Sequence, residues 1–277
     1  MNRIVTAEWL HSELEKQSAA YVIVDTRFQL GNPDVGRVSY LEGHLPGAIY
    51  VDLEKDLSSA VSKHGGRHPL PNIDTLIAKF EKWGIGNESK LIVYDDQGGM
   101  FASRFWWLCH YLGHDDVAIL DGGYSSWLEK GYDVITEIPV PSQKTFSLQV
   151  NDNEVLADAA YVKERLHNTE TVLLDSRELA RYLGKEEPID PIAGHIPGAV
   201  HYFWKDVLDD KGNWKRKEEL KKHFANIPQT KEVIVYCGSG VSACPNILAL
   251  KEAGFSNVKL YSGSWSDWIT YEDYPIE

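Results

Sequence analysis

The chain has 277 residues, 43% of them hydrophobic and 25% charged. The length is sufficient for two ordinary domains, and the composition is globular and gives no indication of disorder. The net charge of -13 argues against a surface that binds nucleic acid or a membrane, because those partners need clustered lysine and arginine. A small anionic ligand is compatible with this charge where a few positive groups gather locally.

The first residues contain no apolar run long enough for a signal peptide, and no segment reaches the ~20 apolar residues of a membrane span. We therefore expect a cytoplasmic protein. Cys109, Cys237 and Cys244 are odd in number and widely spaced, which suits a reducing compartment rather than a disulfide framework. No spacing of histidine and cysteine resembles a metal site, so we expect neither a metal nor another cofactor.

Short β-branched runs alternate with helical patterns along the chain. The expected strands are residues 21–25, 90–94, 117–120, 172–175 and 233–236, and the expected helices include 73–83, 218–224 and 246–253. Strands that alternate with helices predict an α/β fold in which a parallel sheet is covered by helices on both faces.

Four sequence blocks occur twice, in the same order and at nearly constant spacing. The pairs are residues 24–27 and 174–177, 42–48 and 193–199, 91–95 and 233–237, and 123–127 and 264–268. A repeat of this length indicates a duplicated domain rather than a solenoid unit.

The two copies are separated by a stretch that contains Pro139 and Pro141. These prolines block regular structure and favour an extended connector. We therefore expect two tandem domains of the same fold, at residues 1–138 and 154–277, joined by a linker at residues 139–153.

The ligand of an open parallel sheet lies beyond the carboxyl ends of its strands, where the two copies place Asp95 and Cys237. Gly238 and Gly240 can adopt positive φ, which would turn backbone N–H groups toward one point, and Pro245 suits the first turn of the next helix. These donors and the helix dipole would favour the thiolate of Cys237, which predicts a nucleophile near neutral pH.

Three interpretations of this loop compete. It could be a plain turn with a buried cysteine, although two glycines are unusual in that setting. Residues 238–243 also match the dinucleotide fingerprint G-x-G-x-x-G/A, but residues 259–262 lack the acidic residue that should end the next strand. The third interpretation is nucleophilic cysteine catalysis, by transfer of either phosphate or sulfur.

Residues 175–177, 194–199 and 237–243 together resemble the rhodanese family, and specifically its tandem-domain thiosulfate and 3-mercaptopyruvate sulfurtransferases. The resemblance covers nearly the whole chain and implies two rhodanese-like domains. It implies that Cys237 takes a sulfane sulfur as a persulfide and passes it to cyanide, a thiol or thioredoxin. It also implies a first domain that has lost its cysteine, which Asp95 reproduces.

A phosphatase of related topology would resemble C-x5-R, but Ala243 stands where that arginine is needed to clamp a phosphoryl group. We therefore favour sulfur transfer over phosphate transfer. The expected substrate-binding loop consists of Gly238, Ser239, Gly240, Val241 and Ser242.

The resemblance assigns Arg181, in Ala-Arg-Tyr-Leu-Gly, as the cation that binds the anionic donor, with a surface salt bridge as the alternative. Arg177 recurs as Arg27 in the copy without a cysteine, so we expect it to pair with a structural carboxylate. Some mercaptopyruvate enzymes carry a second arginine before the Gly-His-Ile-Pro motif, but residues 186–190 contain none.

The resemblance further suggests that Ser239, His68 and an acid at Glu54 move a proton when mercaptopyruvate reacts. The family usually has aspartate at that last position, and His68 could equally be an ordinary surface histidine. His44 and His195 recur in both copies, so we expect each to hold a turn. We expect Cys244 to be a small buried hydrophobe, with resolution of the persulfide as the alternative.

Two classes of function follow. In the first, the chain is an enzyme that cycles Cys237 through a persulfide, using both donors and favouring mercaptopyruvate because the loop is uncharged. In the second, it is a persulfide carrier or regulatory module with little turnover.

Overall fold

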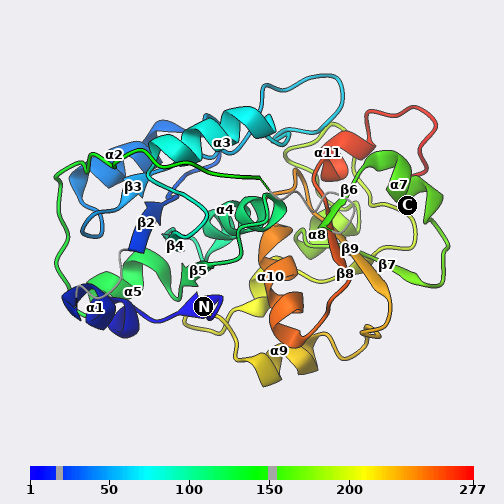
Figure 1. The fold of residues 1–277 in the computed structure, drawn as a ribbon. Helices are drawn as coiled ribbons and strands as arrows, with labels where there is room; N and C mark the ends of the chain where they lie inside the picture. The colour runs from blue at the N-terminus through cyan, green and yellow to red at the C-terminus, as the bar shows by residue number, and fades with distance from the viewer. Residues whose placement is uncertain (17–20, 149–154) are drawn as a thin grey trace. The chain divides into compact units, whose positions relative to one another are not determined.

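The computed structural model describes residues 1–16, 21–148 and 155–277. The chain divides into two compact units (Figure 1), and each is described by itself. The first comprises Met1–Ser59, Pro71–Val150 and Asp210–Trp214, and the second comprises Ala60–Leu70, Asn151–Asp209 and Lys215–Glu277. The expected domain limits at 138 and 154 stay a prediction, and residues 149–153 of the expected linker lie outside the described residues.

The described part of the first unit contains a five-stranded parallel sheet in the order β1-β5-β4-β2-β3. Its strands are β1 (Ile4–Val5), β2 (Tyr21–Asp25), β3 (Ile49–Tyr50), β4 (Lys90–Tyr94) and β5 (Val117–Leu120). Its helices are α1 (Ala7–Lys16), α2 (Asp34–Glu42), α3 (Ile73–Lys82), α4 (Met100–Tyr111) and α5 (Gly123–Glu129). The strands expected in this part of the sequence are confirmed.

The second unit repeats this topology, with a parallel sheet over its described residues in the order β6-β10-β9-β7-β8. Its strands are β6 (Leu156–Ala157), β7 (Thr171–Asp175), β8 (Val200–His201), β9 (Glu232–Tyr236) and β10 (Val258–Tyr261). Its helices are α7 (Ala159–Glu164), α8 (Leu179–Tyr182), the 3-10 helix η1 (Trp204–Val207), α9 (Lys217–His223), α10 (Cys244–Ala253) and α11 (Ser264–Trp268). The α/β fold and the duplication are both confirmed.

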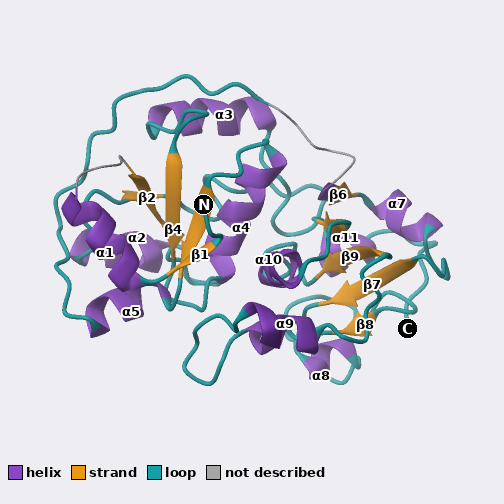
Figure 2. Cartoon of the chain, turned by 60° about the horizontal axis from the view of Figure 1, so that its bottom comes forward, coloured by secondary structure: helices purple, strands orange, loops and turns teal. Residues whose placement is uncertain are grey.

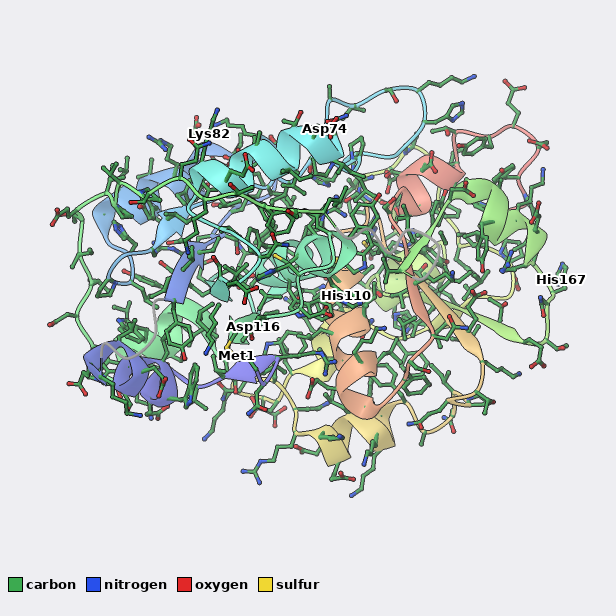
Figure 3. The ribbon with its side chains drawn as sticks, viewed as in Figure 1. Met1, Asp74, Lys82, His110, Asp116 and His167 are labelled. Atoms are coloured by element: carbon green, nitrogen blue, oxygen red, sulfur yellow. The ribbon has the colours of Figure 1, made fainter. Side chains whose placement is uncertain are left out.

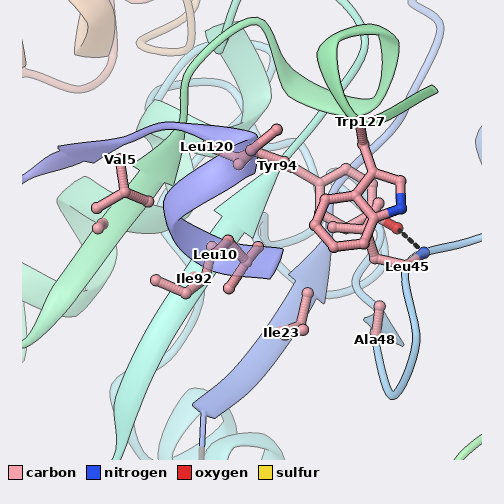
Figure 4. Close-up of a cluster of buried hydrophobic side chains, with 11 residues drawn as sticks. Val5, Leu10, Ile23, Leu45, Ala48, Ile92, Tyr94, Leu120 and Trp127 are labelled. Atoms are coloured by element: carbon pink, nitrogen blue, oxygen red, sulfur yellow. Dashed lines mark hydrogen bonds between the residues drawn. The ribbon is translucent and has the colours of Figure 1, made fainter. Parts of the chain in front are cut away.

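The sheet of the first unit is buried on both faces, which explains its nearly continuous apolar strands. Helices α1 and α5 lie on one side of the sheet and α4 on the other (Figure 2). On the first side, Ile92 and Tyr94 of β4 pack with Leu10 and Trp127, as Figure 4 shows. The hydroxyl of Tyr94 accepts a 3.2 Å hydrogen bond from the N–H of Leu45, which fixes the start of a turn against the core.

The second unit builds the same layer from equivalent residues. Ile234 and Tyr236 of β9 pack with Trp265 and Trp268 of α11. The Tyr236 hydroxyl accepts a 3.1 Å bond from the N–H of Ile196, as Tyr94 does in the first unit. Helix α10 contacts β9 and β10. Because β9 is held in this core, the residue that follows it has a fixed position.

An aspartate and an arginine two residues later form a buried ion pair in each unit. Nη2 of Arg27 lies 2.7 Å from Asp25, and Nη2 of Arg177 lies 2.7 Å from Asp175. Burial by itself would lower the pKa of Arg177, but the Asp175 carboxylate outweighs it and the pKa is raised. The expectation that Arg177 pairs with a structural carboxylate is confirmed.

The two repeated histidines each bind a backbone carbonyl. Nδ1 of His44 lies 2.7 Å from the oxygen of Tyr40, and Nδ1 of His195 lies 2.8 Å from the oxygen of Tyr182. Each imidazole also stacks on the ring of that tyrosine. Both histidines therefore hold turns, as expected. None of the helices that the structure describes has the length and apolar character of a membrane span.

Candidate active site

Cys237 follows β9 directly and is 1% exposed. The N–H of Gly240 donates to its Sγ at 3.2 Å, so one donor of the expected cradle faces the thiol. Gly240 has φ of 77°, and a Cβ there would lie 2.2 Å from the Ser262 carbonyl oxygen. Only glycine fits at this position. Pro245 lies in the first turn of α10, as expected.

Gly238 is required for a different reason than the sequence suggested. Its φ lies outside the left-handed region, so the expected positive φ occurs at Gly240 and not here. A Cβ on Gly238 would lie 2.9 Å from Nη2 of Arg67 and 3.4 Å from both Nη atoms of Arg181. Glycine at this position leaves room for two guanidinium groups beside the residue that follows the nucleophile.

The backbone around Cys237 is held by the start of α11. The N–H of Cys237 donates to Oγ of Ser264 at 3.1 Å, and its carbonyl accepts from the N–H of Trp265 at 3.0 Å. Ser264 is one of two non-glycine residues in the described chain with positive φ, at 55°. This strained serine fixes the nucleophile. It was missed from the sequence, although the repeat pairs it with Gly123, which has the same φ of 55° and could have indicated a positive φ here.

The remaining loop residues are largely buried. Val241 is 3% exposed and Ser242 is half-buried. Cys244 begins α10, is fully buried, and donates from Sγ to the Gly240 carbonyl at 3.4 Å. Cys244 therefore packs as a small buried residue against the loop.

Ser239 and His68 meet in the second unit. Nδ1 of His68 lies 2.7 Å from Oγ of Ser239, and both residues are 7% exposed. The interpretation of His68 as an ordinary surface histidine is therefore wrong, because the side chain is buried against the loop.

The segment that carries His68 is anchored to α11 and the residues after it. The N–H of Gly65 donates to Oδ1 of Asp267 at 2.7 Å, and the N–H of Arg67 donates to Oγ of Ser266 at 3.1 Å. Gly66 has φ of 78°, and a Cβ on it would lie 2.4 Å from the Gly263 carbonyl oxygen. These contacts explain why residues 60–70 belong to the second unit.

Glu54 belongs to the first unit and is exposed. Its N–H donates to the carboxylate of the buried Asp52 at 2.9 Å. Its suggested part in proton transfer stays a prediction.

Arg181 and Arg67 share one carboxylate. Nη2 of Arg181 lies 3.0 Å from Oδ2 of Asp190, and Nη1 of Arg67 pairs with Oδ1 of the same residue. Burial lowers the pKa of Arg67, and the neighbouring Arg181 lowers it further. Arg67 and Asp190 were missed from the sequence, although the position of Arg67 directly before His68 could have drawn attention to it.

A second carboxylate continues this network. Nε of Arg181 lies 3.0 Å from both carboxylate oxygens of Glu187, and Glu187 also lies 3.3 Å from Nη1 of Arg177. Arg181 therefore forms buried ion pairs rather than the surface salt bridge considered as the alternative, and it lies beside the cysteine loop. Its role in binding the donor stays a prediction.

The loop of the first unit carries a carboxylate in place of the thiol. Asp95 accepts hydrogen bonds of 2.8–3.0 Å from four backbone N–H groups, those of Gln97, Gly99, Phe101 and Ala102. Burial raises the pKa of Asp95, and these four bonds oppose that shift. In the first unit, the backbone donors that follow β4 are thus already hydrogen-bonded to the Asp95 carboxylate.

A pocket of about 590 Å³ lies in the first unit, lined by residues that include Met1, Trp9 and Asp116. The amino group of Met1 lies 3.4 Å from the Asp116 carboxylate, and Figure 3 labels both residues. Its described lining does not include Cys237 or His68, so this pocket is separate from the candidate site.

Known proteins resemble this chain over nearly its whole length. The model of the rhodanese-like domain matches residues 6–130 and 158–271. The chain is 40% identical over 279 residues to a probable 3-mercaptopyruvate sulfurtransferase of Pseudomonas aeruginosa, covering 99% of this chain and 97% of that protein. It is 32% identical over 277 residues to the thiosulfate sulfurtransferase of Bos taurus, covering 96% and 91%.

Among solved structures, the crystal structure of SseA from Escherichia coli, described as a 3-mercaptopyruvate sulfotransferase, is 31% identical. It superimposes with a TM-score of 0.83, over 96% of this chain and 100% of that one. These matches span both units. The chain therefore belongs to the rhodanese family, as a two-domain sulfurtransferase.

Proposed function

We propose that this protein transfers a sulfane sulfur from 3-mercaptopyruvate or thiosulfate to a thiophilic acceptor through a persulfide on Cys237. The observation that carries the proposal is the surroundings of Cys237. Its Sγ accepts a hydrogen bond from the N–H of Gly240, and the guanidinium groups of Arg67 and Arg181 lie beside Gly238. A thiolate next to cations and backbone donors is suited to attack the sulfur of an anionic donor.

In the first half-reaction the Cys237 thiolate attacks the donor sulfur, and an S–S bond forms. With mercaptopyruvate the C–S bond breaks, and its electron pair leaves with the carbon as the enolate of pyruvate. With thiosulfate the S–S bond of the donor breaks and its electron pair leaves with sulfite. In the second half-reaction cyanide or a thiolate attacks the outer sulfur, which regenerates the Cys237 thiolate.

The enolate needs a proton, and we assign its supply to the Ser239–His68 pair. The 2.7 Å separation of Oγ and Nδ1 lets a proton pass from the imidazole through the hydroxyl. Sulfite needs no such proton. We therefore propose that the protein uses both donors, with mercaptopyruvate favoured.

The proposed acceptor is a thiol or a thioredoxin-like protein, and the proposed compartment is the cytoplasm. None of the three cysteines is in a disulfide, which suits a reducing environment.

The test is Cys237→Ser, assayed for pyruvate release from mercaptopyruvate and for thiocyanate release from thiosulfate and cyanide. We expect both activities to disappear, because a hydroxyl cannot form a persulfide. Cys109→Ala, which removes a buried thiol of the first unit, should remain active. Activity in Cys237→Ser beyond a trace would contradict the proposal. A wild type that loads one sulfur but turns over hardly at all would instead identify a persulfide carrier.

A further inference from the structure

We infer that Asp190 selects the charge of the sulfur donor: its carboxylate bridges Arg67 and Arg181 and thereby disfavours dianionic donors relative to monoanionic ones. The inference rests on the proposed function, because it concerns the donor of that same site. It also assigns Arg67, rather than a residue near Arg181 in the sequence, as the second guanidinium of the donor site.

Two guanidinium groups lie beside the cysteine loop. A Cβ on Gly238 would lie 2.9 Å from Nη2 of Arg67 and 3.4 Å from Nη1 and Nη2 of Arg181, so both guanidinium groups are in contact range of this position. An anionic group of a donor whose sulfur approaches Cys237 therefore meets these two side chains. The stretch 186–190 lacks an arginine, and Arg67 brings a second cation from a distant part of the chain.

Asp190 is more deeply buried than the two arginines that it bridges. Its side chain is 3% exposed, whereas the side chains of Arg67 and Arg181 are 31% and 13% exposed. The carboxylate thus lies behind the two guanidinium groups, which keep a route to solvent. A donor that binds to them must share them with a resident anion.

The ion pairs around Asp190 balance in charge. Arg67, Arg181 and Arg177 are connected to Asp190, Glu187 and Asp175 by ion pairs. Three positive charges face three negative ones, so these ion pairs are neutral among themselves before a donor enters. A monoanionic donor adds one negative charge beside this network and the nearby Cys237 thiolate, and a dianionic donor adds two. Electrostatic energy in a partly buried site rises with that excess. Mercaptopyruvate binds through one carboxylate, whereas thiosulfate carries two negative charges.

The direct test is Asp190→Asn, which removes one negative charge and keeps the shape of the side chain. We expect the ratio of kcat/KM for thiosulfate to kcat/KM for mercaptopyruvate to rise by about 10-fold, as expected for one fewer repulsive charge near the donor. Glu186→Gln is the matched control, because Glu186 is exposed and its substitution changes the net charge equally. That control should keep the wild-type ratio. An unchanged ratio in a folded Asp190→Asn protein overturns the inference.

A second pair of variants keeps the test decisive if Asp190→Asn is unstable. Arg67→Gln leaves Asp190 on Arg181 alone, so KM should rise about 10-fold for both donors. Arg67→Gln/Asp190→Asn removes both charges, and we expect it to recover much of the loss because Arg181 is released. A double variant as impaired as Arg67→Gln overturns the inference.

These outcomes are separable from failure of the proposed function. If Cys237→Ser is inactive and Asp190→Asn keeps the wild-type ratio of kcat/KM for the two donors, only the charge-selection inference fails. If Cys237→Ser keeps its activity, the proposed function itself fails.

Discussion

Two glycines two residues apart are needed for different physical reasons. Gly240 satisfies a backbone requirement, because its φ is positive and the Ser262 carbonyl leaves no space for a Cβ. Gly238 satisfies a side-chain requirement, because Arg67 and Arg181 lie against it. Substitutions at the two positions should therefore affect different properties.

Gly238→Ala should weaken donor binding more than folding. The added methyl meets the movable ends of two arginines, so they shift and lose contact with the donor. We expect KM for both donors to rise about 10-fold, which corresponds to ~1.4 kcal/mol. Initial rates over a range of donor concentrations measure it, with thermal unfolding as the check on the fold. A loss of stability with an unchanged KM would mean that the arginines do not contact the donor.

His68→Gln should affect the two donors differently. The substitution keeps a polar side chain but removes the group that supplies a proton to Ser239. We expect kcat with mercaptopyruvate to fall about 100-fold, which is within the usual range for loss of general acid catalysis, here by way of the Ser239 hydroxyl. With thiosulfate kcat should fall far less, because sulfite leaves without a proton. Equal losses for both donors would make His68 a positioning residue instead.

At the scale of elements, the loops after β4 and β9 occupy equivalent places in the two units but surround different side chains. Each begins at the carboxyl end of a central strand of the sheet. After β9 the backbone donor of Gly240 faces a thiol, and after β4 four donors face the Asp95 carboxylate. By the repeat, Gly31 and Gln97 stand where the second unit has Arg181 and Ser239.

Asp95→Cys should not create a second site of sulfur transfer, because Arg181 and Ser239 of the second unit have no counterparts in the first. After loading with mercaptopyruvate, mass spectrometry should find one added sulfur, and none in Asp95→Cys/Cys237→Ser. The variant should also lose about 1–3 kcal/mol of stability, since the four donors lose a charged acceptor. Two added sulfurs would show that backbone donors alone suffice.

At the scale of the whole molecule, the chain exchanges short segments between its two compact units. Ala60–Leu70 lies in the sequence between β3 and β4 of the first unit but belongs to the second unit, and Asp210–Trp214 belongs to the first. The first of these segments delivers Arg67 and His68 to the cysteine loop. The catalytic domain thus depends on residues from the other half of the sequence.

Gly66→Ala should detach that segment, because the new Cβ would lie 2.4 Å from the Gly263 carbonyl oxygen. Gly198→Ala is the matched control, since Gly198 has a similar φ of 75° and no atom within 4 Å of its Cβ position. Both variants carry the strain of positive φ, roughly 1–3 kcal/mol. We expect only Gly66→Ala to lose mercaptopyruvate activity as well, by 10-fold or more. Equal activities in the two variants would contradict the anchoring role of this segment.

The sequence by itself determined the α/β fold, the duplication, the position of Cys237 and the structural role of Arg177. These follow from patterns within short stretches: strands of β-branched residues, glycines in a loop, and blocks that repeat. The sequence also pointed to His68 and Ser239 through a family resemblance, but their contact joins residues 171 positions apart.

Only the tertiary structure decided which cations meet at the cysteine loop. Arg67 and Asp190 are 123 positions apart, and neither belongs to a periodic pattern or a repeated block. The tertiary structure also showed that Gly238 leaves room for the side chains of Arg67 and Arg181, and that Ser264, with its positive φ, holds the backbone of Cys237. The physical reason is the same in each case. Periodicity and turn chemistry depend on neighbours in the chain, whereas charge pairing and close approach depend on segments that meet only after the sheet and its helices have packed.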